Sequence, residues 1–132
     1  MRFGVDLGIG FQIRDDVLNL TANSKYGKEI GGDIVEGKRT LVLIHLMENA
    51  NRNDKEAVTA IMKKGKSKSK EDVQKILLLM KKYGSIDYAK NRAEEFSQSA
   101  LKQFDRMFGH LPNSTPKRHL HSLVEFMVAR DW

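Results

Sequence analysis

The chain has 132 residues, the size of one domain, and we expect a single domain over residues 1–132. It has no cysteine, which excludes disulfide bonds and thiol catalysis, and with neither a signal-peptide pattern nor a bilayer-spanning apolar run we expect a cytoplasmic protein. The net charge is +6, and much of the positive excess lies in a lysine-rich run at 63–70.

Residues 3–20 predict a helix that is apolar on most sides. Four polar residues recur at steps of three and four and so share one helix face: Gln12, Asp15, Asp16 and Asn19. Adjacent carboxylates in an apolar helix need partners, a wet cavity or a metal, and magnesium is a cation that carboxylate oxygens bind. The alternative is a solvated acidic face with Arg14 as a loose ion partner.

Residues 21–39 predict a glycine-rich loop, and two of its lysines, Lys28 and Lys38, are suited to hold phosphate by charge. An ordinary surface loop with solvated lysines is the alternative. Residues 32–38 nearly match a phosphate-binding P-loop, but Arg39 stands where Ser or Thr is needed and no buried strand precedes the loop. Helix and loop together therefore predict a magnesium–diphosphate site.

Downstream, apolar periodicity predicts only helices, so the expected class is an all-α helical bundle. The expected segments are 40–49, a helix capped by Asp54, 71–83, a helix from Ser85 to about Phe108, and 117–130. The lysine run has no interleaved aromatic residue for base stacking, so we expect an exposed connection and no nucleic-acid partner. His119 and His121 point to different sides of a helix, which argues against a shared metal.

These residues resemble the trans-isoprenyl diphosphate synthases, the family of farnesyl and geranylgeranyl diphosphate synthases. The family's second aspartate-rich motif, Phe-Gln-x-x-Asp-Asp-x-x-Asp, is matched at 11–19, with Asn19 in place of the last aspartate. Asparagine keeps an oxygen ligand but loses the charge. Further family segments follow in the right order: Gly-Lys at 27–28, aspartate at 33, Gly-Lys-x-Thr at 37–40, Gly-Ser-Ile-x-x-Ala at 84–89, and the segments 111–114 and 128–132.

The resemblance implies the C-terminal half of the isoprenoid synthase fold and magnesium-dependent, head-to-tail condensation of isopentenyl diphosphate with an allylic diphosphate. The implied catalytic residues are Asp15, Asp16, Gln12 and Lys28. The implied diphosphate-binding residues are Lys28, Lys38, Asp33 and Arg130. The implied Mg²⁺ ligands are Asp15, Asp16 and Asn19.

The family's first aspartate-rich motif has no equivalent in this sequence. We therefore expect a subunit of a split, hetero-oligomeric synthase whose partner is an N-terminal-half chain that carries that motif. A non-catalytic interaction or regulatory subunit, or an inactive fragment, is the alternative. Without a partner the first helix is expected to expose apolar surface at Phe3, Val5, Ile9 and Ile13.

Overall fold

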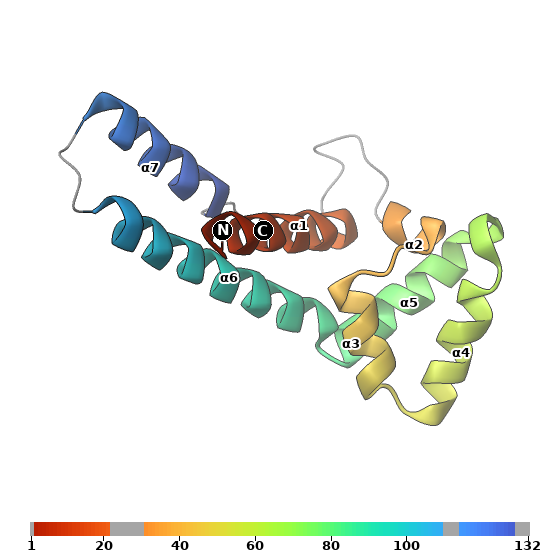
Figure 1. Cartoon of the computed structure of the whole chain (residues 1–132). Coiled ribbons are helices and arrows are strands. Elements are labelled where there is room, and N and C mark those ends of the chain that lie inside the picture. Colours follow the sequence, from red (N-terminus) through yellow and green to blue (C-terminus); the bar gives the residue numbers. More distant parts are fainter. Residues whose placement is uncertain (1, 22–30, 110–113, 129–132) are drawn as a thin grey trace.

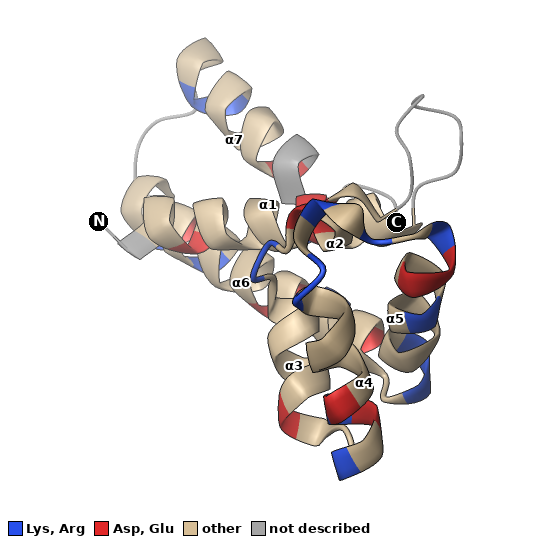
Figure 2. Ribbon diagram, turned by 90° about the vertical axis from the view of Figure 1, so that its right-hand side faces the viewer, with Lys and Arg blue, Asp and Glu red and all other residues tan. Residues whose placement is uncertain are grey.

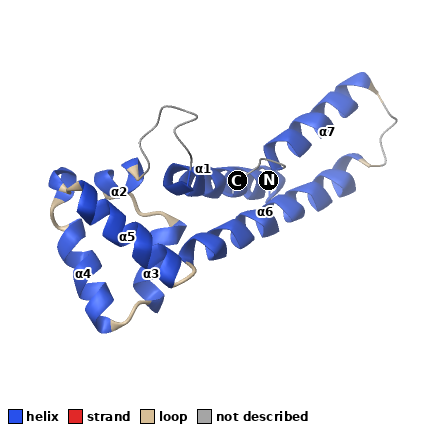
Figure 3. Ribbon diagram, turned by 180° about the vertical axis from the view of Figure 1, so that it is seen from behind, coloured by secondary structure: helices blue, strands red, loops and turns tan. Residues whose placement is uncertain are grey.

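The structure is a computed structural model that describes residues 2–21, 31–109 and 114–128, and all regular structure in these ranges is helical (Figure 3). The expected all-α class is confirmed. The described elements are α1 (Arg2–Thr21), α2 (Gly32–Glu36), α3 (Leu41–Asn49), α4 (Arg52–Met62), the 3-10 turn η2 (Gly65–Ser67), α5 (Lys70–Lys82), α6 (Ser85–Phe108) and α7 (Thr115–Val128). No helix in the described part of the chain is long and apolar enough to cross a membrane.

The long helix α6 is the axis of the molecule (Figure 1). α1 packs lengthwise against α6, and α7 returns along α6 and also touches α1. The helices α2 to α5 form a second group, in which α3 and α5 contact α6 and α4 lies outermost against α5. Buried apolar side chains connect the two groups into one core.

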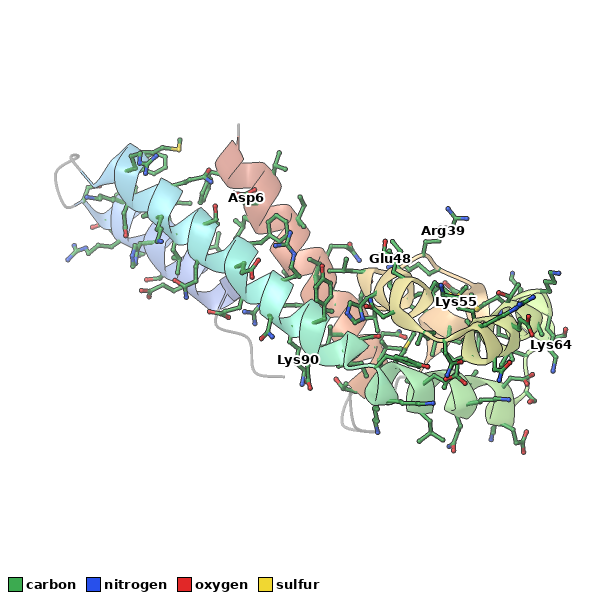
Figure 4. The ribbon with its side chains drawn as sticks, turned by 90° about the horizontal axis from the view of Figure 1, so that it is seen from below. Asp6, Arg39, Glu48, Lys55, Lys64 and Lys90 are labelled. Carbon is green, nitrogen blue, oxygen red and sulfur yellow. The ribbon has the colours of Figure 1, made fainter. Side chains whose placement is uncertain are left out.

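Three residues through which α1 packs on α6 are not apolar: Asp6, Gly10 and Arg14. Asp6 is buried, and its Oδ2 accepts hydrogen bonds at 2.7 Å from Ser99 Oγ and from Gln103 Nε2 (Figure 4). One turn later, a Cβ on Gly10 would lie 3.4 Å from atoms of α6, so glycine allows close approach of the two helices. A further turn on, Arg14 is buried, and its guanidinium lies 3.1 Å from Glu94 of α6.

These contacts fix the position of α1 along α6. Residues 6, 10 and 14 follow one another along α1, whereas their partners run in the opposite direction along α6, so the two helices are antiparallel. Another face of α1 remains open: Val5 is 55% and Ile9 is 38% exposed. The expected exposure of Ile13 is wrong, because Ile13 joins the core, and Phe3 is half-buried with its ring near that of Phe104.

The expected helix cap at Asp54 is wrong. Asn51 caps α4 instead, with its Oδ1 accepting from the backbone N–H of Asp54 at 2.8 Å. The Asp54 carboxylate turns to α5, where it accepts hydrogen bonds from the Tyr83 hydroxyl and the Lys82 ammonium. These donors, the tyrosine first, lower the pKa of Asp54 below its ordinary value.

Ser85 is also not a cap. Gly84, in the left-handed conformation, precedes α6, and Ser85 is its first residue. The Ser85 hydroxyl is fully buried and lies 2.9 Å from Nδ1 of His45 on α3. The His45 ring stacks on Tyr88 of α6 with 4.3 Å between centroids. This serine therefore joins α3 to α6.

The expected loop at 21–39 contains a short helix that the sequence pattern did not predict. α2 begins after Gly31, which has φ of +88°. A Cβ at Gly31 would lie only 2.6 Å from Cγ1 of Val73 on α5. Backbone conformation and packing therefore both require glycine here. By contrast, a Cβ at Gly65, with φ of +57°, would meet no atom within 4 Å.

These two glycines give a stability prediction. We expect Gly31→Ala to lower the free energy of unfolding by at least about 1 kcal/mol more than Gly65→Ala, because overpacking adds to the left-handed strain only at position 31. Urea unfolding of the three chains measures the difference. Adding Val73→Ala to Gly31→Ala should recover part of the loss, and equal destabilisation by both glycine substitutions would contradict the packing argument.

Candidate functional site

The polar side chains of α1 meet α2 and the α2–α3 connection at one place. Figure 2 shows acidic and basic segments side by side there. Most of the residues that the sequence singles out gather in this region: Gln12, Asp15, Asp16, Asn19, Asp33 and Lys38. Two further predicted residues, Lys28 and Arg130, lie outside the described residues.

The centre of the site is an ion pair between α1 and the α2–α3 connection. Lys38 Nζ donates to Asp16 Oδ1 at 2.9 Å, and Gln12 Nε2 donates to the same oxygen at 3.1 Å. Asp33 Oδ2 lies 3.9 Å from Lys38 Nζ. Asp16 is buried, so its charge needs these donors. The hydrogen bond to Asp16, with added attraction from Asp33 and Asp15, raises the pKa of Lys38 above its ordinary value.

The two adjacent carboxylates have different surroundings. Asp16 points into the ion pair, whereas Asp15 is exposed on the same side of α1 as the exposed Gln12. Arg14, the expected loose ion partner of this pair, is buried against α6 and pairs with Glu94 instead. Arg14 therefore joins α1 to α6, while the Asp15 side chain is exposed to solution.

The carboxylates of this site suit a metal ion that also binds phosphate and water better than one enclosed by protein ligands alone. In the described ranges, no three His, Cys, Asp or Glu side chains come together closely enough to hold a metal. Magnesium is commonly bound through one or two carboxylates and takes its other oxygens from phosphate and water. Asp15 and Asp16 fit that role, with Lys38 supplying a further positive charge for phosphate.

Asn19 has a role that sequence reasoning missed. Its Oδ1, expected to be a metal ligand, accepts a hydrogen bond from the backbone N–H of Asp33 at 3.0 Å. Its backbone carbonyl accepts from the N–H of Gly31 at 2.9 Å. Asparagine is a preferred capping residue, but this cap acts on a helix 14 residues away, so local sequence gives no signal for it.

Two lysines of the run at 63–70 bond to other parts of the chain, and one histidine of α7 lies near a glutamate. In the lysine run, Lys64 pairs with Asp72 at 2.9 Å, and Lys68 Nζ donates to the carbonyl of Val35 at 3.2 Å. His119 is exposed, and His121 lies 3.5 Å from Glu125 on its own helix. His110 lies outside the described residues.

Titration tests the central ion pair. Asp16→Asn should lower the pKa of Lys38 toward the ordinary lysine value, because the charge that holds the proton is removed. Since the folded-state pKa is raised, the pair stabilises the folded chain below the ordinary lysine pKa and loses this effect as pH rises through the folded value. An NMR titration of the Lys38 side chain measures the shift.

The matched control is Glu48→Gln, which removes an exposed carboxylate from α3 (Figure 4). It should leave the Lys38 midpoint unchanged. The free-energy difference between wild type and Asp16→Asn should also shrink with rising alkaline pH. A Lys38 midpoint that is the same with and without Asp16 would contradict the ion pair.

Comparison with known proteins identifies relatives along nearly the whole chain. A profile of the polyprenyl synthetase family matches residues 1–80. Geranylgeranyl diphosphate synthase of Sulfolobus acidocaldarius is 38% identical over 129 residues, which is 97% of this chain. Octaprenyl diphosphate synthase of Haemophilus influenzae is 36% identical over 131 residues, or 98% of this chain. The chain spans only 38% of the length of each of these relatives.

Solved structures agree with this assignment. Geranylgeranyl pyrophosphate synthetase from Pyrococcus horikoshii superposes with a TM-score of 0.81 at 40% identity, covering 98% of this chain and 38% of that one. Geranylgeranyl pyrophosphate synthase from Corynebacterium glutamicum, complexed with isoprenyl diphosphate and magnesium, gives a TM-score of 0.78 at 28% identity, covering 98% of this chain and 36% of that one. The chain belongs to the polyprenyl synthetase family and has the helical fold of the isoprenyl diphosphate synthases.

Proposed function

We propose that this chain is one subunit of a split, hetero-oligomeric isoprenyl diphosphate synthase, and that it supplies the second aspartate-rich motif. The reaction would be the magnesium-dependent, head-to-tail condensation of isopentenyl diphosphate with an allylic diphosphate. The observation that carries the proposal is the exposed Asp15 carboxylate beside the ion pair of the buried Asp16 with the exposed Lys38, on the helix that also exposes Val5 and Ile9. One relative with this fold is complexed with isoprenyl diphosphate and magnesium, which supports the substrate class.

The residues of the site match the charge changes of this reaction. As the carbon–oxygen bond of the allylic diphosphate breaks, its electron pair leaves with the diphosphate, and isopentenyl diphosphate then attacks the allylic cation. Positive charge placed where the diphosphate gains negative charge stabilises that step. We assign this role to the Lys38 ammonium, and to Lys28 and Arg130 on the basis of the family motif alone.

Asp15 and Asp16 are the proposed magnesium ligands, and Asp33 orients Lys38 and acts on the ligand through water. When bound, magnesium would supply further positive charge to the departing diphosphate. Gln12 is exposed on the same helix face and donates to Asp16, so it both supports that carboxylate and faces the allylic unit. Asn19 is left out of this ligand set because its Oδ1 is bonded to the Asp33 N–H.

The proposed partner is an N-terminal-half chain that covers the open face of α1. Most of each relative's length has no counterpart in this chain, because the match spans only 38% of it. Val5 and Ile9 lie on the open face one to three turns before Gln12 and Asp15. A partner that buries them would also enclose the diphosphate site and exclude water from a reactive cation.

A non-catalytic interaction subunit is the second candidate. The observation in its favour is the Lys38–Asp16 hydrogen bond, since a satisfied pair gives α1 and α2 a structural link without any ligand. This candidate and an inactive fragment both predict that no prenyl transfer depends on the two aspartates. The following measurements separate them from the split enzyme.

The first measurement is prenyl transfer by this chain combined with a partner that carries the first aspartate-rich motif, isolated with this chain as bait. We expect the double substitution of Asp15 and Asp16 by alanine to reduce the rate by at least about 100-fold, the scale of losing electrostatic stabilisation of the leaving group. The control pair, Glu71→Ala with Asp87→Ala, removes two exposed carboxylates from α5 and α6 and should retain activity. Equal rates in both double variants would overturn the site assignment.

The second measurement is partner binding. Ile9→Glu places a charge on the open face of α1 and should abolish association with the partner, because a buried unpaired charge is costly. Leu78→Glu makes the same change at a side chain that is 65% exposed on α5 and should bind like wild type. Sedimentation velocity measures association, circular dichroism checks the fold, and equal binding by both variants would show that the partner docks elsewhere.

A further inference from the structure

Asn19 receives two hydrogen bonds from the start of α2. The N–H of Gly31 donates to its backbone carbonyl at 2.9 Å, and the N–H of Asp33 donates to its Oδ1 at 3.0 Å. Gly31, the residue before α2, makes no side-chain cap, so Asn19 supplies the capping oxygen from α1. The two bonds tie the start of α2 to the end of α1, one through the backbone and one through the Asn19 side chain.

α2 in turn determines where Lys38 lies. The N–H of Lys38 donates to the carbonyl of Asp33 at 3.0 Å, and the N–H of Gly37 donates to Ile34 at 3.0 Å. From there Lys38 Nζ reaches back to Asp16 Oδ1 at 2.9 Å. Asp16 lies one helical turn before Asn19, so the contacts form a closed circuit from Asn19 through Asp33 and Lys38 to Asp16.

We propose that Asn19 is a positioning residue, which acts through Asp33 and α2 to hold the Lys38 ammonium against Asp16, and is not itself a metal ligand. The inference concerns the geometry of the site and rests on the proposed function only for the nature of the ligand. Arg39, next to Lys38, is exposed and points away from the helices (Figure 4), so the fixed side chain in this connection is Lys38.

The amide of Asn19 is also the suitable capping group for its position. Residue 19 lies in the last turn of α1, whose end Thr21 marks, and a negative charge there opposes the helix dipole. A carboxylate at 19 would also stand one turn from Asp15 and Asp16 and add a third like charge. Asparagine supplies the acceptor oxygen for Asp33 without that charge.

NMR relaxation of the labelled chain tests the proposal through the order parameter of Lys38 Nζ. Asn19→Leu removes the acceptor at similar size and should release Lys38, seen as a lower order parameter. Asn19→Asp keeps the acceptor and should retain it. Asn51→Leu removes the same kind of cap from α4, where Asn51 Oδ1 accepts from Asp54 at 2.8 Å, and should not affect Lys38.

A double variant distinguishes positioning from metal ligation. In an Asp16→Asn background Lys38 has already lost its nearest charged partner, so Asn19→Leu should have little further effect on the Lys38 order parameter. The order parameters are measured without Mg²⁺, where loss of a residue that acted only as a metal ligand would leave Lys38 unchanged. An unchanged Lys38 in the single Asn19→Leu variant, or an equal fall in both backgrounds, would overturn the proposal.

A second observable covers the case in which Asn19→Leu does not fold. Hydrogen exchange of the Asp33 amide in the unmodified chain should be slowed by the bond to Asn19, and exchange at the rate of an unprotected amide would overturn the proposal. These measurements need neither partner nor turnover. Absence of prenyl transfer would therefore count against the proposed function and leave the role of Asn19 to be decided separately.

Discussion

The arrangement of the molecule depends on the polar contacts of Asp6 and Arg14 of α1 with α6, which we call the polar seam. The helix α1 turns Asp6, Gly10 and Arg14 toward α6 and leaves Val5 and Ile9 open, while its Ile13 joins the apolar core. Hydrogen bonds and ion pairs are directional, so this seam fixes how far α1 lies along α6 as well as which face it presents. Val5 and Ile9 thereby remain exposed, and the carboxylates of the aspartate motif follow later on the same helix.

The seam also explains why neighbouring residues of the motif do different work. One turn of α1 contains Arg14, which is buried toward α6, Asp16, which is directed to Lys38, and Asp15, which is exposed. The orientation of the helix directs the arginine to Glu94 of α6. The cation that pairs with Asp16 is Lys38, which comes from the second group of helices. The site therefore joins the two groups, and its geometry depends on both.

Sequence reasoning predicted the helices and the candidate site residues because both have local signals: apolar periodicity, glycines and a dense motif. It missed α2, whose five residues are too few for a periodic pattern. It also missed the burial of Asp6 and Arg14 and the cap from Asn19, whose partners are 14 to 97 residues away. Local propensity allows Asp54 or Ser85 to cap a helix. The structure shows that the N-cap residues of α4 and α6 are Asn51 and Gly84.

The separation of α1 from α6 along the chain has a consequence for synthesis on the ribosome. Arg14 and its partner Glu94 are 80 residues apart, so at roughly 5–20 residues per second α1 emerges several seconds before α6 can receive it. During that interval α1 exposes both its polar seam and its apolar face. A nascent helix in this state is a substrate for chaperones, and a second nascent chain on the same message could exchange α1 with it.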